Sequence, residues 1–89
     1  MSAARTVTLR YFAWVREKVG RSEEAVSLPE AVTTIGELTA WLRTRGPGYA
    51  SAFERDGLVR AAIDQNHVRP EAPLAGAREI AFFPPVTGG

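Results

Sequence analysis

One segment, residues 34–46, has the features of a well-bounded amphipathic helix, and it limits the folds available to the chain. Thr34 and Glu37 have capping-box spacing, in which the Thr34 hydroxyl accepts the Glu37 N–H and the Glu37 carboxylate accepts the Thr34 N–H. Gly46-Pro47 is expected to end the helix, because glycine tolerates a left-handed cap and proline prevents continuation. Apolar residues recur on one face of this helix, namely Ile35, Leu38, Trp41 and Leu42.

Alternating apolar residues on both sides of this helix predict strands, because successive side chains of a strand point to opposite faces. The first such segment contains Val7, Leu9 and Tyr11 on one face, with Thr8, Arg10 and Phe12 on the other. The other predicted strands are Ala25–Leu28, 59–63, the short segment His67–Val68, and Glu79–Phe83.

The connections are predicted to be short helices, turns and one loop. Ala13–Val19 is expected to form a short helix that stops at Gly20, and the four-residue spacing of Tyr49 and Phe53 indicates one or two further turns. The remaining connections are turns at Asp56-Gly57 and Gln65-Asn66 and a loop over Pro70–Ala77.

This order of elements predicts an α+β roll. The chain has 89 residues, which is one domain, and one main helix over a mixed sheet of four or five strands matches the β-grasp, or ubiquitin-like, arrangement. The expected domain covers residues 1–83, and residues 84–89 form an extended tail outside it.

Composition excludes several classes of function. The formal net charge of +1 gives no strong field for nucleic acid or an anionic membrane. The absence of cysteine excludes disulfides, thiolate nucleophiles and cysteine metal sites. No signal peptide or membrane-length apolar run is evident, so the cytoplasm is the expected location.

Isolated polar residues give no catalytic or metal-binding pattern. His67 has no cysteine and no suitably spaced carboxylate beside it, so no metal site is predicted, and it is expected in a turn or an interface. Glu23-Glu24 is interpreted as solvated charge. The serines lack a His–Asp pattern, so nucleophilic catalysis by a side chain is not supported.

The chemical element is expected to be the tail, Pro84, Pro85, Val86, Thr87, Gly88 and Gly89. The two prolines favour an extended arm, and the two glycines lack the Cβ atoms that would hinder passage through a narrow channel. The Gly89 carboxylate can attack the α-phosphate of ATP, and the resulting adenylate can react with sulfide or a persulfide to give a thiocarboxylate. The tail therefore predicts a carrier of an activated acyl group.

Strand parity predicts a docking surface near the root of this tail. If Tyr11 points into the core, Phe12 points out, and if Phe82 points in, Phe83 points out. Two outward aromatic residues would form an apolar patch for a partner, whereas a helix turn or loop over this face would make both of them core residues.

Three segments resemble the MoaD family, the small subunits of molybdopterin synthase. The end Phe83-Pro84-Pro85-Val86-Thr87-Gly88-Gly89, with Ile80–Phe82 before it, is similar to the family's terminal signature. Arg10–Gly20 is similar to its opening segment, and Arg60–Asn66 to its third strand. The resemblance spans nearly the whole chain and implies a ubiquitin-like fold.

The resemblance implies a sulfur carrier without activity of its own. An E1-like enzyme would use ATP to adenylate Gly89, and a sulfur donor protein would supply the thiocarboxylate, with no cofactor bound by the carrier itself. Two carriers would bind a dimer of the large synthase subunit, which holds the catalytic pocket and the cyclic pyranopterin monophosphate. The family places Phe12 and Phe83 in this interface; His67 stands where the family tends to have an apolar contact residue.

Three alternatives use the same features. The same fold and terminal pair serve as sulfur carrier for thiamin thiazole or tRNA thiolation, although the Phe83-Pro84-Pro85 arm favours the molybdopterin branch. A ubiquitin-like protein modifier would join Gly89 to a target lysine. In an interaction domain the tail would be inert, and removing Gly88-Gly89 would leave its function intact.

Overall fold

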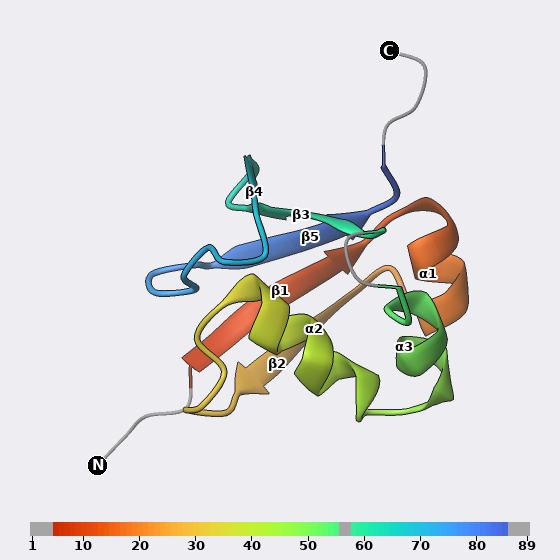
Figure 1. Cartoon of the computed structure of the whole chain (residues 1–89), viewed down its shortest axis with the longest axis horizontal. Coiled ribbons are helices and arrows are strands. Elements are labelled where there is room, and N and C mark those ends of the chain that lie inside the picture. Colours follow the sequence, from red (N-terminus) through yellow and green to blue (C-terminus); the bar gives the residue numbers. More distant parts are fainter. Residues whose placement is uncertain (1–4, 56–57, 86–89) are drawn as a thin grey trace.

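A five-stranded mixed sheet carries its helices on one side (Figure 1). The computed structural model describes residues 5–55 and 58–85. Its strands are β1 (Arg5–Tyr11), β2 (Glu23–Leu28), β3 (Arg60–Ile63), β4 (Asn66–Val68) and β5 (Glu79–Phe83), and its helices are α1 (Ala13–Val19), α2 (Ile35–Arg43) and α3 (Pro47–Ala52). This order matches the predicted α+β roll. Among the described residues, no helix combines the length and apolarity that crossing a bilayer requires.

The first and last strands are neighbours at the centre of the sheet. The strand order is β2-β1-β5-β3-β4, and only the β1–β5 pair is parallel. In that pair Leu9 faces Ile80 and Tyr11 faces Phe82, and the Phe12 N–H donates to the Phe82 carbonyl at 3.0 Å. The C-terminal end of β5 therefore lies beside the end of β1 and the start of α1 (Figure 1).

The core lies between the sheet and the helices. The alternation predicted in the first and last strands is confirmed, since Leu9, Tyr11, Ile80 and Phe82 have at most 1% of their surface exposed. The helices and loops cover these side chains with Val15, Ile35, Leu38, Leu42, Ala52, Phe53 and Leu74. Burial of this apolar surface is the main stabilising contribution to a domain of this size.

The main helix begins as predicted and ends earlier. The Thr34 hydroxyl accepts the Glu37 N–H at 3.2 Å, while the Glu37 carboxylate accepts the N–H and the hydroxyl of Thr33 at 2.7 and 2.8 Å, one residue further back than expected. These bonds hold the pKa of Glu37 below its usual value. The prediction that Gly46-Pro47 ends this helix was wrong, because α2 stops at Arg43 and Gly46-Pro47 starts α3.

The β3–β4 turn is one residue earlier than predicted. Asp64 and Gln65, not Gln65-Asn66, are its central residues, and both have positive φ, as a two-residue hairpin turn of the primed type requires. The Asp64 carboxylate accepts the N–H groups of Arg78 and Glu79 at 3.1 and 2.9 Å. This turn therefore holds the beginning of β5.

A buried carboxylate joins the end of the sheet to α3. The side chain of Glu24 is only 5% exposed and accepts hydrogen bonds from the hydroxyls of Tyr11 and Tyr49 at 2.7 and 2.6 Å. Arg45 and Arg21 form ion pairs with it at 3.2 and 3.3 Å. The interpretation of Glu23-Glu24 as solvated charge was therefore wrong for Glu24. Arg21 in the segment before β2 and Arg45 in the turn after α2 lie beside its carboxylate, together with the two tyrosine hydroxyls.

The cluster changes the acid–base properties of its members. Burial acts to raise the pKa of Glu24, but the two tyrosine hydroxyls and the two guanidinium groups outweigh it and hold that pKa below the usual range. Burial and the nearby Glu24 carboxylate raise the pKa of Tyr11 and of Tyr49.

The backbone of α3 lies in close contact with the backbone of α1. A Cβ placed on Gly48 would lie 2.5 Å from the carbonyl oxygen of Lys18, a distance that real Cβ atoms do not reach. Only glycine lets α3 come this close to the last turn of α1.

Gly48→Ala should therefore destabilise the fold by about 1–3 kcal/mol, because the added methyl group must push the two helices apart. Urea unfolding measured at equilibrium checks this. Gly36→Ala is the matched control within α2, where the new Cβ would meet the Pro70 carbonyl at 3.4 Å. It should be neutral or stabilise by up to about 1 kcal/mol, since alanine is the better helix former. Equal effects of both changes would contradict the close approach.

Glu24→Gln should lower the free energy of unfolding at neutral pH by about 2 kcal/mol, the scale of buried hydrogen bonds to a charged group. A group with a lowered folded-state pKa stabilises the fold above its unfolded pKa of roughly 4.3 and loses that effect as pH falls. The difference between wild type and variant should thus shrink below about pH 4. Urea unfolding across this pH range tests it, and a constant difference would argue against a charged Glu24.

Candidate functional site

The described part of the predicted tail is its root. Pro84 and Pro85 follow β5 directly and are half-buried against the domain. The predicted site residues Val86, Thr87, Gly88 and Gly89 lie outside the described residues. What the structure defines is therefore the place from which the tail starts and the surfaces that surround it.

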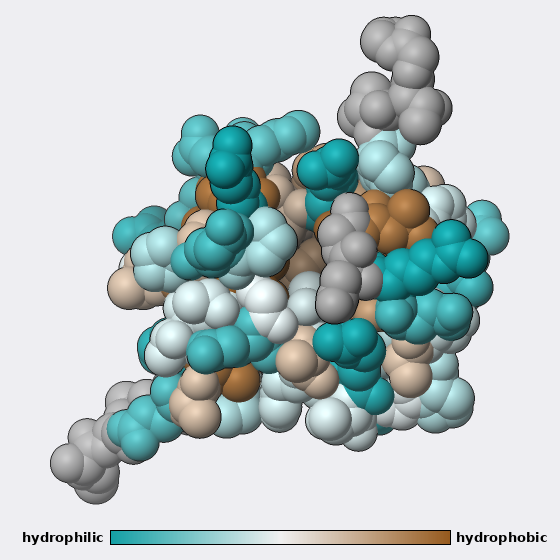
Figure 2. All heavy atoms as spheres, in the orientation of Figure 1, coloured by the Kyte–Doolittle hydropathy of each residue, from teal (hydrophilic) through white to brown (hydrophobic). Residues whose placement is uncertain are grey.

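A hollow of about 550 Å³ lies against this root. Trp14 and Lys18 of α1 form one wall, and Pro84 and Pro85 form another. The Lys18 ammonium donates to the Ser51 hydroxyl at 3.1 Å. The remaining lining residues come from α3 and the segment after it, namely Ser51, Ala52, Glu54, Arg55 and Leu58. In Figure 2, brown apolar atoms reach the surface beside the base of the C-terminal segment, with teal polar atoms around them.

The predicted docking residues lie on the sheet face opposite the core. Phe12 is 42% exposed, and Phe83 is half-buried, so both side chains stay out of the core as strand parity predicted. Tyr11 faces Phe82 in the parallel register. The next residues along the two chains are Phe12, directly after β1, and Phe83, at the end of β5, so these two residues are neighbours across the sheet. The exposed His67 of β4 joins them through a ring contact with Phe83 at 5.1 Å between centroids.

Small and charged residues complete this outer face. Ala62 pairs with Ala81 on one side and with His67 on the other, and Ala62 is buried although it lies outside the core cluster. Arg10 lies 5.7 Å from the Phe12 ring and forms ion pairs with Glu79 and Glu23 at 3.1 and 3.6 Å. The result is a shallow apolar strip of Phe12, Phe83, Ala62 and Ala81, with Arg10 beside it paired to Glu79 and Glu23, which suits contact with another protein.

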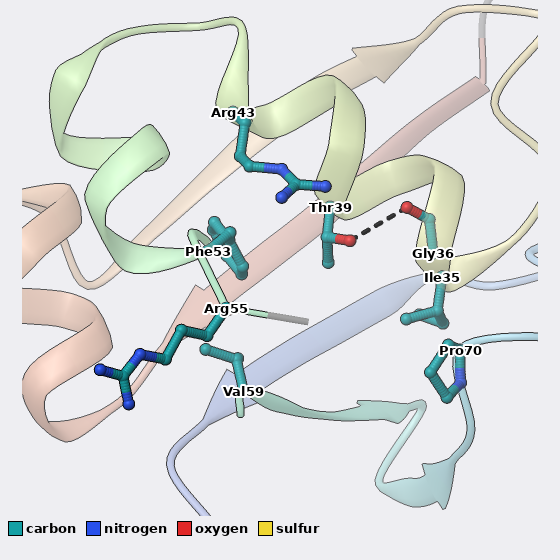
Figure 3. Close-up of a pocket in the computed structure, with 8 residues that line it drawn as sticks. All are labelled: Ile35, Gly36, Thr39, Arg43, Phe53, Arg55, Val59 and Pro70. Atoms are coloured by element: carbon teal, nitrogen blue, oxygen red, sulfur yellow. Dashed lines mark hydrogen bonds between the residues drawn. The ribbon is translucent and has the colours of Figure 1, made fainter. Parts of the chain in front are cut away.

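A second hollow of about 410 Å³ lies on the helix side, between α2 and the segment that leads into β3 (Figure 3). Ile35, Phe53 and Val59 give it an apolar floor, and Arg43 extends over it from α2. The Thr39 hydroxyl that lines it donates to the Gly36 carbonyl at 3.0 Å. None of the predicted site residues that the structure describes lines this hollow.

The described side chains form no catalytic constellation. Across residues 5–55 and 58–85, no group of three His, Cys, Asp or Glu side chains could hold a metal ion. Ser51, which the sequence gave no nucleophilic role, has Lys18 as its hydrogen-bond partner and no histidine.

Sequence reasoning missed the hollow at the tail root. Trp14 and Lys18 belong to α1, and Ser51 belongs to α3. Because β2 and α2 separate these two helices in the sequence, no local pattern links the three residues. One signal was available, since Lys18 is the only lysine in the chain.

Comparison with known proteins identifies the family. The model of the ThiS family matches residues 9–89, which include the last three residues of β1, all later strands, the three helices and the terminal glycine pair. The chain belongs to the ThiS family. Within this family, it is 37% identical over 83 residues to the molybdopterin synthase sulfur carrier subunit of Escherichia coli, covering 93% of this chain and 99% of that protein.

Solved structures share the fold of this ThiS-family chain. SAMP1 from Haloferax volcanii superposes with a TM-score of 0.72 at 22% identity, over 96% of this chain and 100% of that one. A chain in the complex of subunits 1 and 2 of the molybdopterin-converting factor from Helicobacter pylori gives a TM-score of 0.61 at 21% identity, over 96% of this chain and 100% of that one. At these identities the likeness shows the fold, and the predicted ubiquitin-like β-grasp is confirmed.

Proposed function

We propose that this chain is the sulfur carrier subunit of molybdopterin synthase, which delivers sulfur from a thiocarboxylate on Gly89 to cyclic pyranopterin monophosphate. The observation that carries the proposal is the 37% identity to the Escherichia coli carrier subunit over nearly the full length of both proteins. The Gly88-Gly89 end that follows β5 and the Pro84-Pro85 root supports it, because this end supplies the reactive group.

Charging begins at the Gly89 carboxylate. An E1-like enzyme catalyses attack of one carboxylate oxygen on the α-phosphate of ATP, so that a C–O–P linkage forms and pyrophosphate leaves. The terminal sulfur of a persulfide on a donor protein then attacks the Gly89 carbonyl carbon, so that a C–S bond forms, the C–O bond to AMP breaks and AMP leaves. A thiol then reduces the S–S bond that joins carrier and donor, which releases the thiocarboxylate and leaves a disulfide. The carrier contributes the carboxylate and the arm but no bound cofactor, since ATP is consumed by the activating enzyme.

Delivery requires a partner with a catalytic pocket. The relatives named as the sulfur carrier subunit support placing the pocket and the substrate on the large synthase subunit. The strip of Phe12, Phe83, Ala62 and Ala81 lies beside the tail root and gives that subunit an apolar surface to bind while the tail enters its pocket. The related Helicobacter pylori protein has been solved as a complex of subunits 1 and 2. By analogy with the MoaD family, two carriers bind one dimer of the large subunit. We place this assembly in the cytoplasm.

The first experiment is the intact mass of the chain after incubation with an E1-like enzyme, ATP and a sulfur source. We expect a species heavier by one oxygen-to-sulfur exchange, located at Gly89 by fragmentation. With the large subunit added, this species should revert to the carboxylate as cyclic pyranopterin monophosphate gains sulfur. The chain truncated after Thr87 is the control and should stay uncharged.

Other outcomes separate the competing functions. Thiocarboxylate that forms but is not consumed by the large subunit would favour thiamin thiazole or tRNA thiolation instead. Covalent attachment to other proteins, seen as bands of higher mass on denaturing gels, would favour a protein modifier. A chain that never acquires sulfur at Gly89 would contradict the carrier function in all its forms.

The docking strip gives a separate prediction. Phe12→Ser and Phe83→Ser should each weaken binding to the large subunit by about tenfold or more, because central aromatic contacts carry about 1–2 kcal/mol each. Isothermal titration calorimetry measures the affinity. The matched control is Thr6→Ser at the opposite end of β1, which is exposed on the same face and should leave the affinity unchanged. Unchanged affinity of both phenylalanine variants, with normal unfolding curves, would place the interface elsewhere.

A further inference from the structure

Two exposed arginines continue the docking strip towards the β4 edge of the sheet (Figure 1). Arg60 begins β3 and pairs in register with Phe83, whose side chain lies on the outer face. Arg69 directly follows β4, and continuing the antiparallel register of β3 and β4 by one residue puts it opposite Arg60. We call Arg60 and Arg69 the arginine pair. The pair and Phe83 thus form one row across three neighbouring segments of the sheet.

The arginine pair lines a hollow of about 340 Å³ together with His67. The His67 ring meets the Phe83 ring with centroids 5.1 Å apart, so this hollow adjoins the docking strip. Backbone and small side chains of β3 and β4 complete the lining, at Ala61 and Val68. Every polar side chain of the lining offers N–H groups, and none is acidic, which suits a ligand that accepts hydrogen bonds and carries negative charge.

Neither guanidinium of the pair has an acidic partner in the described part of the chain. The ion pairs found there join Arg10, Arg21 and Arg45 to carboxylates. Directly opposite residues on antiparallel strands have Cβ atoms only about 5 Å apart, and like charges in such positions destabilise a sheet. The free chain therefore carries a repulsive contact that a carboxylate from outside would relieve.

We propose that the arginine pair binds an aspartate or glutamate side chain that the large synthase subunit presents next to its contact with Phe83. This rests on the proposed function, because it concerns the partner that the carrier serves. Guanidinium groups are planar and match the two oxygens of a carboxylate, and an anion between them cancels their repulsion. The pair thereby selects a partner whose surface has an acidic residue beside an apolar patch.

The surroundings of the pair favour a protein carboxylate over a free anion or a nucleic acid. The hollow adjoins the docking strip, so one partner surface can contact the phenylalanines and the arginines at the same time. Further along the same face the charge of Arg10 is already balanced by Glu23 and Glu79. The formal net charge of +1 gives no extended positive field, which a polyanion would require.

Calorimetric titration with the large subunit tests the proposal. Wild-type affinity should fall about tenfold between about 20 and about 500 mM NaCl, because salt screens charge pairs at a protein surface. Arg60→Gln combined with Arg69→Gln should weaken binding about tenfold at low salt and lose most of this salt dependence. The same double variant should unfold at an equal or higher urea concentration than wild type, because the repulsion is gone.

A single substitution has a matched control at the other end of β5. Arg69→Gln alone should weaken binding about threefold, the scale of one exposed charge pair. Arg78→Gln removes the same charge from the exposed residue before β5 and should leave the affinity and its salt dependence unchanged. Opposite effects on affinity and stability for the pair, and neither for the control, would support a role in binding.

Carbodiimide cross-linking locates the partner carboxylate. Arg69→Lys keeps the charge and supplies an amine that attacks a carbodiimide-activated carboxyl carbon, so that a C–N bond forms and the reagent leaves as a urea. In the complex we expect an amide that joins position 69 to an aspartate or glutamate of the large subunit. Arg78→Lys is the control and should give no such cross-link. Peptide masses separate these products from those of Lys18, which both variants share.

An affinity for the large subunit that does not depend on salt, equal losses for Arg69→Gln and Arg78→Gln, or equal cross-linking of the two lysine variants would each overturn the proposal. Binding of inorganic phosphate that the double variant loses, with unchanged affinity for the large subunit, would also overturn it and assign the pair to a free anion. All these results leave the proposed function intact, because sulfur gain by the carrier is measured separately. A wild-type chain that neither gains sulfur nor binds the large subunit would instead contradict the proposed function.

Discussion

Parallel pairing of β1 with β5 is the contact on which the rest of the molecule depends. It brings together the first and the last strand of the chain, which share the most buried side chains of the sheet, Leu9, Tyr11, Ile80 and Phe82. A parallel pair needs a long connection, and here that connection supplies β2, all three helices and the β3–β4 hairpin. The same pairing puts the exit of the tail beside α1, so the position of the functional end follows from the packing of the core.

A chain of aromatic contacts connects the core to the Glu24 cluster near the surface. The Phe82 ring stacks near Tyr11 and meets Phe53 edge to face, with centroids 6.1 and 5.0 Å apart. The Tyr11 hydroxyl in turn reaches Glu24, which also holds Tyr49 of α3. The helices beside the tail root are thus tied to the strand that carries the tail by both apolar packing and a buried carboxylate.

The fold and the outer face could be predicted because they depend on short-range periodicity. Alternation in β1 and β5 placed Tyr11 and Phe82 inside and Phe12 and Phe83 outside, and the glycine pair with its proline arm indicated the chemistry. The Glu24 cluster could not be predicted, because its donors come from segments far apart in the sequence that only the tertiary fold brings together. The hollow at the tail root could not be predicted for the same reason. The end of α2 was predicted at the wrong residue because Gly46-Pro47 fits the start of one helix as well as the end of another.

The direction of β5 also determines how the domain responds to a pulling force. Arg5 begins β1 at one end of the sheet, and Pro85 follows β5 at the other, so tension between these two points runs along the strands. Such a load acts in shear on all the hydrogen bonds of the parallel pair at once, whereas a hairpin pulled at its open end breaks its bonds one after another. The Asp64 carboxylate, bonded to the N–H groups of Arg78 and Glu79, fixes the far end of β5 against sliding. The domain should therefore resist tension applied between Arg5 and Pro85 more strongly than tension applied across the sheet.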